Sequence, residues 1–154
     1  MELYGKTILS CYMMLDKIVN QIENLIKTRA RNSFYDYSST LKQSDKILKM
    51  CNVRIDLLEL KEIAKEALNC LNNEQITLIS YKYFGILPKE KDFDLTSRNY
   101  FRKQVKALKT FSSILKNKGH NEEWFVNKYL TIPFIGGAYQ RVLNEQGKKH
   151  SMCV

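Results

Sequence analysis

Apolar residues in this chain recur every three or four positions over long stretches, and few helix breakers interrupt them. Residues 4–27 show the pattern most clearly. Their apolar side chains form two series with a spacing of seven residues: Tyr4, Cys11, Ile18 and Leu25, and Ile8, Leu15 and Ile22. This spacing places side chains on one face of an α-helix, whereas a half-buried strand would alternate. With only six Gly and two Pro in 154 residues, too few for the turns of an all-β fold, the sequence predicts an all-α helical bundle.

The N-terminal part, residues 1–71, is predicted to form a long helical hairpin. We expect one continuous helix over residues 4–27, a loop over 28–40 and a second helix from Thr40 or Leu41 to Leu71. A heptad seam must be covered by another helix, of the same chain or of a second copy. An antiparallel intramolecular pair is therefore expected, with a homodimer through residues 4–27 as the alternative.

A second part, residues 72–146, shows clear signals for helix ends. Asn72 and Gln75 have the spacing of a capping box, which predicts a helix over residues 73–84. Gly85 suits the left-handed position after that helix, and Pro88 stops it. Residues 85–95 are expected to be irregular, with at most one helical turn from Pro88.

Two shorter helices and a tail are expected towards the C-terminus. Gly119 ends the preceding helix, and His120 or Asn121 caps a helix that carries Trp124, which we expect to anchor the core. Pro133 separates it from a short last helix, where Gly136 and Gly137 indicate a turn or a close helix contact. Residues 147–154 are predicted to be a flexible, frayed tail.

The net charge of +9 is concentrated in one segment. Residues 96–118 contain seven Lys or Arg and no Asp or Glu: Arg98, Arg102, Lys103, Lys106, Lys109, Lys116 and Lys118. The segment is predicted to be a helix that begins at Thr96 or Ser97 and ends near Asn117. Its predicted buried stripe is Phe101, Val105, Leu108, Phe111 and Leu115. The cations predicted on the opposite side are Arg102, Lys103, Lys106, Lys109 and Lys116. Such a concentration of one charge is typical of a protein that binds a polyanion.

A basic helix of this kind fits the major groove of B-DNA. Arg and Lys could reach guanine edges or phosphates, and Asn99 could read adenine. Gln104 could do the same, with a position too close to the core as the alternative. Hydroxyl groups at Thr96 and Ser97, with the free N–H groups of the first turn, could hold a phosphate. The simpler interpretation is a Lys-rich bundle helix whose charged face only keeps the protein in solution.

Two segments of the chain resemble a known protein family: LNNEQITLISYKYFG and LTSRNYFRKQVKALKTF. Over residues 71–117 the chain resembles the C-terminal promoter-reading domain of bacterial sigma factors and the related phage late-transcription regulators. Tyr83, Phe84 and Gly85 match the family's helix-end positions, and the second segment matches its recognition helix. Between them stands PKEKDFDL, where the family's middle helix carries a Glu-Ile-Ala stretch.

The resemblance implies a helix-turn-helix-like unit that binds double-stranded DNA in transcription regulation, of a phage or mobile-element type. It implies that five residues lie nearest the bases and two nearer the backbone. The residues near the bases are Ser97, Arg98, Asn99, Arg102 and Lys103, and those near the backbone are Lys106 and Lys109. RNA polymerase is a further partner that the resemblance suggests, through the helical hairpin.

Other functional classes have little support in the sequence. His120 and His150 have no partners at metal-ligand spacing, so neither a metal nor a cofactor is expected. No nucleophile or phosphate-loop motif occurs, so we do not expect an enzyme. No apolar run reaches the length of a membrane span, and four scattered cysteines suit reduced thiols, which favours a cytoplasmic protein.

Two alternatives to DNA binding remain open from the sequence. The chain could be a helical interaction module, an adaptor or anti-factor, whose basic helix docks on an acidic protein surface. It could also bind RNA through the same helix.

Overall fold

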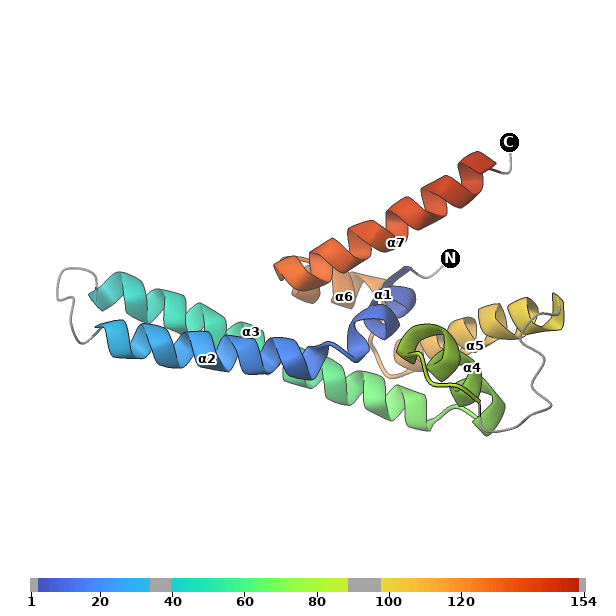
Figure 1. Ribbon diagram of the computed structural model, residues 1–154, viewed down its shortest axis with the longest axis horizontal. Coiled ribbons are helices and arrows are strands. Elements are labelled where there is room, and N and C mark those ends of the chain that lie inside the picture. The colour runs from blue at the N-terminus through green and yellow to red at the C-terminus, as the bar shows by residue number, and fades with distance from the viewer. Residues whose placement is uncertain (1–2, 34–39, 89–97, 153–154) are drawn as a thin grey trace. The chain divides into compact units, whose positions relative to one another are not determined.

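The computed structural model describes residues 3–33, 40–88 and 98–152. Within these ranges the chain is all-helical, as predicted, with seven helices and no strand (Figure 1). The bounds are α1 Leu3–Tyr12, α2 Leu15–Ser33, α3 Thr40–Asn69, α4 Asn73–Phe84, α5 Arg98–Asn117, α6 Glu122–Tyr129 and α7 Pro133–Met152. Within the described part of the chain, no helix is long and apolar enough to cross a membrane.

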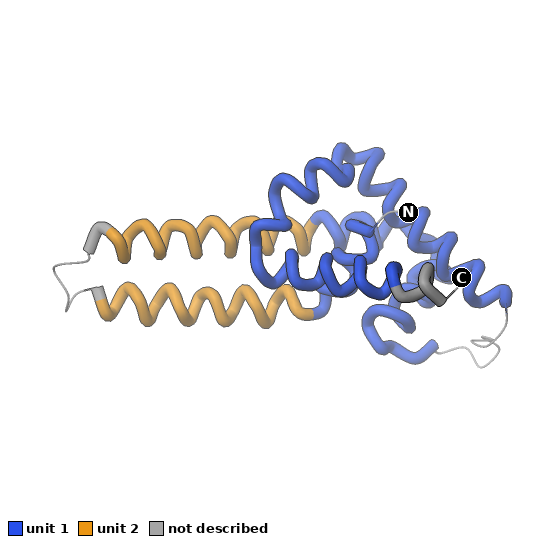
Figure 2. Tube along the Cα trace, turned by 90° about the horizontal axis from the view of Figure 1, so that it is seen from above, with its two compact units in different colours: residues 1–13, 63–154 blue, residues 14–62 orange. Residues whose placement is uncertain are grey.

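The helices belong to two compact units (Figure 2). Unit 1 contains residues 1–13 and 63–154, and unit 2 contains residues 14–62. These limits differ from the predicted boundaries after residues 71 and 146, because α1 packs with the C-terminal helices α4, α5, α6 and α7. Helix α1 therefore belongs to the unit that carries the basic helix.

The prediction of one continuous helix over residues 4–27 is wrong. Helix α1 ends at Tyr12 and α2 begins at Leu15, although neither Gly nor Pro marks the break. The first part of the heptad pattern, including Tyr4 and Ile8, is buried in unit 1, whereas Leu25 in unit 2 is 52% exposed. A homodimer seam along the whole segment would need Tyr4 and Ile8 at the surface, whereas both are buried. A homodimer through residues 4–27 stays a prediction.

Unit 2 is the antiparallel pair that the sequence predicts, formed by α2 and the first part of α3 (Figure 1). Arg54 Nε lies 2.7 Å from Glu23 Oε1, and Lys61 Nζ lies 2.6 Å from Asp16 Oδ1. The residues of α3 thus meet those of α2 in reverse order, which defines the antiparallel register. Helix α3 ends at Asn69, two residues before the predicted end at Leu71.

Helix α1 is central to the packing of unit 1. The ring of Tyr4 lies 6.0 Å from that of Phe125 in α6, and its hydroxyl donates to the carbonyl of Ser112 in α5 at 3.3 Å. Tyr12 meets Phe84 of α4 with ring centroids 5.3 Å apart. Short as it is, α1 reaches the other helices of this unit with large buried side chains, and this burial is the main favourable term for its folding.

The predicted helix ends of unit 1 are largely confirmed. Asn72 and Gln75 form both hydrogen bonds of the capping box, and Gly85 has a positive φ of 68°. Gly119, with φ 88°, follows α5, and Asn121 accepts a hydrogen bond from the Trp124 amide. The prediction of a frayed tail from residue 147 is wrong up to Met152, because α7 continues through it.

The two adjacent glycines of α7 allow a matched test of this packing. A Cβ at Gly136 would lie 2.7 Å from the backbone oxygen of Leu130, whereas a Cβ at Gly137 would have nothing within 4 Å. Backbone cannot move aside as a side chain can, so Gly136→Ala should lower the free energy of unfolding by about 1–3 kcal/mol. Gly137→Ala should raise it by up to about 1 kcal/mol, through helix propensity. Thermal unfolding followed by circular dichroism measures both, and equal midpoints would contradict the close contact.

Candidate nucleic-acid interface

Helix α5 buries a different face from the one predicted. Its buried residues are Tyr100, Gln104, Ala107, Phe111, Ser112 and Leu115. Phe111 and Leu115 belong to the predicted stripe, but Phe101 is 64% exposed and Val105 is 45% exposed. In the first half of α5, the buried face is therefore displaced by one residue, and two apolar side chains lie at the surface.

The displacement follows from hydrogen bonding between α4 and α5. The side-chain amide of Gln104, only 4% exposed, donates to the backbone oxygen of Leu78 in α4 and to the hydroxyl of Tyr100 at 3.1 Å. A buried polar group is tolerated where such partners exist. The expectation that Gln104 reads adenine is consequently wrong, because its amide faces α4.

Three further contacts hold α5 against α4. Tyr81 and Tyr100 meet edge to face, with ring centroids 6.1 Å apart. Gln75 Nε2 donates to Thr110 Oγ1 at 3.4 Å, and Lys103 Nζ lies 2.7 Å from Glu74 Oε1. Because these contacts extend from the first turn of α5 to its middle, they fix the rotation of the helix about its own axis.

The cations of α5, and Lys118 directly after it, lie at the surface. All seven Lys and Arg of residues 98–118 are exposed. At about 100° per residue, Arg98, Arg102, Lys106 and Lys109 fall within an arc of about 80°, opposite the buried side chains. We call these four residues the cationic face. Among the described residues, none of the four has a carboxylate partner.

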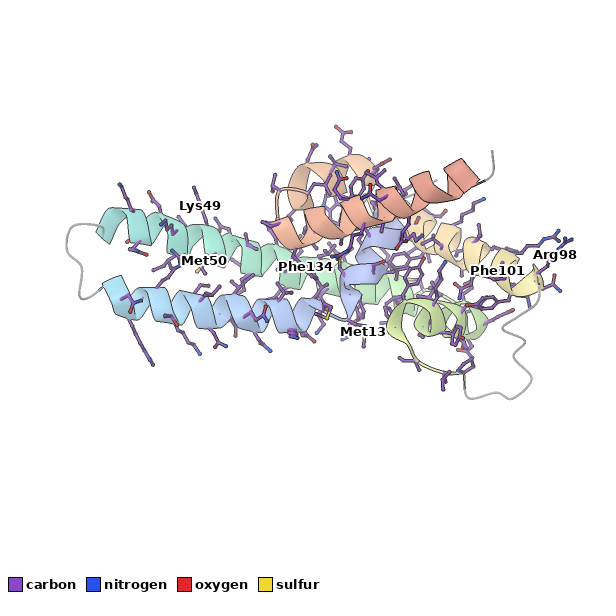
Figure 3. All side chains as sticks on the ribbon, turned by 45° about the horizontal axis from the view of Figure 1, so that its top comes forward. Met13, Lys49, Met50, Arg98, Phe101 and Phe134 are labelled. Carbon is purple, nitrogen blue, oxygen red and sulfur yellow. The ribbon has the colours of Figure 1, made fainter. Side chains whose placement is uncertain are left out.

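The remaining predicted site residues are placed less favourably or not described. Lys103 is exposed, but it lies at the border with α4 and its charge is paired with Glu74. Asn99 is exposed in the first turn of α5. Ser97, the predicted cap Thr96 and all but the first residue of the segment in place of the family's middle helix fall in residues 89–97, outside the described residues. Figure 3 shows Arg98 and Phe101 at the same end of α5.

Behind the interface, the phenol of Tyr83 is held in its neutral form. Burial raises the pKa of Tyr83 to about 12, and the nearby Glu145 and Tyr100 act in the same direction. The hydroxyl is buried without a hydrogen-bond partner among the described residues. Tyr83 therefore contributes packing at the end of α4, and the positive charge of the surface comes from α5.

No other arrangement for chemistry appears in the described part of the chain. It holds no group of three or more His, Cys, Asp or Glu that could bind a metal ion, and Cys11, Cys51 and Cys70 are free thiols. Comparison of the chain with protein-family models, curated proteins and solved structures finds no match. The cationic face is thus the feature on which a functional proposal must be built.

The role of Gln104 can be tested without touching a cation. Gln104→Ala should lower the free energy of unfolding by about 1–3 kcal/mol, because it removes two buried hydrogen bonds to α4 and Tyr100. Asn99→Ala, an exposed amide on the same helix, should change it by less than about 0.5 kcal/mol. Urea unfolding measures the difference, and equal effects of the two substitutions would refute the role of Gln104 as the buried anchor.

Proposed function

We propose that this protein binds double-stranded DNA, and that it does so as a transcription regulator. The observation that carries the proposal is the cationic face, Arg98, Arg102, Lys106 and Lys109, exposed on one side of α5 and without carboxylate partners among the described residues. Solvated helices ordinarily mix charges of both signs on such a face, and α5 contains no acid.

The dimensions and chemistry of duplex DNA suit this face. An α-helix is about 10–12 Å wide with its side chains, and the major groove of B-DNA is about 12 Å wide. Arg98 and Arg102 lie near the start of α5, where a helix that enters the groove end-on reaches base edges. Lys106 and Lys109, one to two turns later, are placed for contact with phosphates.

The resemblance to promoter-reading domains of sigma factors is what favours transcription over other roles of DNA binding. Its two segments overlap α4 and the first part of α5, and α4 ends at Phe84, with Gly85 as its cap. In this proposal α4 packs against the buried side of α5 and leaves the cationic face free for DNA. The hairpin of unit 2 is our candidate for a contact with RNA polymerase.

Salt dependence tests the proposal against the alternative of an acidic protein partner. If α5 neutralises about four phosphates, log affinity for duplex DNA should fall with log salt at a slope of about −4, because each contact releases a condensed counterion. Fluorescence anisotropy with a labelled random-sequence duplex gives the slope. No salt-dependent binding to this duplex would count against DNA and leave the protein-interaction module as the better hypothesis.

A matched pair of double substitutions locates the surface. Arg102→Ala with Lys106→Ala should weaken duplex binding about 10- to 100-fold near 0.1 M salt and reduce the slope by about two. Lys42→Ala with Lys46→Ala removes the same charge at the same spacing from exposed positions of α3, and should have little effect. Both variants should keep their helical circular dichroism. Equal losses of binding would mean that only net charge matters and would reject α5 as the interface.

Glu74 offers a test with the opposite sign. Glu74→Gln releases Lys103 from its ion pair and removes a negative charge beside the interface, so duplex binding should tighten about 2- to 10-fold. Glu66→Gln, an exposed acid near the end of α3, is the control and should change binding less. The same anisotropy titration measures both. Weaker binding by the Glu74 variant would show that the pair positions Lys103 for the contact.

A further inference from the structure

We propose that Phe101, together with Val105, forms an apolar edge that contacts thymine methyl groups in the major groove. The inference rests on the proposed function and names the part of the ligand that α5 reads. It starts from the two apolar side chains that the predicted stripe placed in the core and the structure places at the surface.

The apolar edge adjoins the cationic face. Phe101 and Val105 are four residues apart and so share one side of α5. At about 100° per residue, Val105 lies about 20° from Arg98 around the helix, and Phe101 about 60°. A duplex whose phosphates were held by Lys106 and Lys109, with Arg98 and Arg102 at the base edges, would therefore bring its groove against Phe101. Exposed apolar groups next to a binding surface are typical of contact residues.

The ring of Phe101 also packs against the buried ring of Tyr100. It meets the ring of Tyr100 edge to face, with centroids 5.3 Å apart and an interplanar angle of 71°. Tyr100 is itself buried and accepts a hydrogen bond from Gln104 at 3.1 Å. Because Phe101 packs against a buried ring, its side chain loses little conformational entropy on binding, which suits a contact residue.

Duplex DNA offers one apolar group to such an edge. In the major groove the base edges present hydrogen-bond donors and acceptors, and thymine adds its C5 methyl group. An A-form RNA duplex has a major groove that is too deep and narrow for a helix, and uracil lacks the methyl group. The cations next to Phe101, which have no carboxylate partner within the described ranges, favour a polyanion as the occupant, and the apolar edge selects thymine within it.

The experiment removes the methyl group from the DNA and the ring from the protein. Duplexes of 20 base pairs are first selected by the full chain from a random library, and a selected duplex is then remade with deoxyuridine in place of each thymine in turn. Wild-type protein should lose affinity about fourfold for each contacted methyl, corresponding to the ~0.8 kcal/mol of one buried carbon group. Phe101→Ala should bind the thymine duplex more weakly and lose that sensitivity.

Controls separate the apolar edge from DNA binding in general. Val126→Ala, an apolar residue of α6 that is 36% exposed, should keep the wild-type sensitivity to deoxyuridine. Phe101→Leu should keep part of it, and retained helical circular dichroism shows that each variant is folded. The salt slope of Phe101→Ala should stay close to that of the wild type, because no cation is removed.

Two results would overturn the inference while leaving DNA binding intact. In the first, deoxyuridine weakens wild-type protein and Phe101→Ala equally, or weakens neither. In the second, Phe101→Ala weakens binding to single-stranded oligothymidine more than to duplex, which would assign the ring to stacking on unpaired bases. A wild-type chain without salt-dependent duplex binding would instead reject the proposed function itself.

Discussion

The buried amide of Gln104 determines how α5 is presented. Its hydrogen bonds to Leu78 and Tyr100 place a polar residue in the interface with α4, where an apolar stripe was expected. Because the helix is rigid, turning one position inward turns the others with it. Phe101 and Val105 consequently face solvent, and the cations near them form one surface.

The same interface distinguishes one cation of α5 from the four of the cationic face. Lys103 lies at the border with α4, where Glu74 neutralises it, whereas Arg98, Arg102, Lys106 and Lys109 lie farther round the helix. A positive potential is strongest where no counter-charge lies nearby, so the arrangement concentrates the field of the helix on its outer side. The ion pair itself is exposed, and it adds little to stability.

Helix α1 shows how one sequence pattern can serve two cores. The heptad positions from Tyr4 to Leu25 are continuous in sequence, yet the helix stops at Tyr12 and restarts at Leu15. Tyr4 fills a site between α5 and α6, and Tyr12 packs on α4. Periodicity measures which residues share a face, and it does not report whether one partner or two cover that face.

The sequence by itself determined the helical class, the antiparallel pairing of α2 with α3, and the ends of α4 and α5 near Gly85 and Gly119. These features depend on local chemistry: helical spacing, capping side chains and residues that tolerate a positive φ. The sequence also located the cations, because residues 96–118 contain seven Lys or Arg and no Asp or Glu.

Only the tertiary structure decided which side of α5 is buried, where the first helix breaks and that Lys103 pairs with Glu74. Tyr100 and Phe101 are adjacent aromatic residues, and periodicity alone favoured the wrong one for the core. The choice between them depends on two residues of α4 that lie more than fifteen positions away in sequence. The backbone oxygen of Leu78 accepts a hydrogen bond from Gln104, and the ring of Tyr81 packs edge to face on Tyr100. Contacts of this kind exist only after the helices have packed.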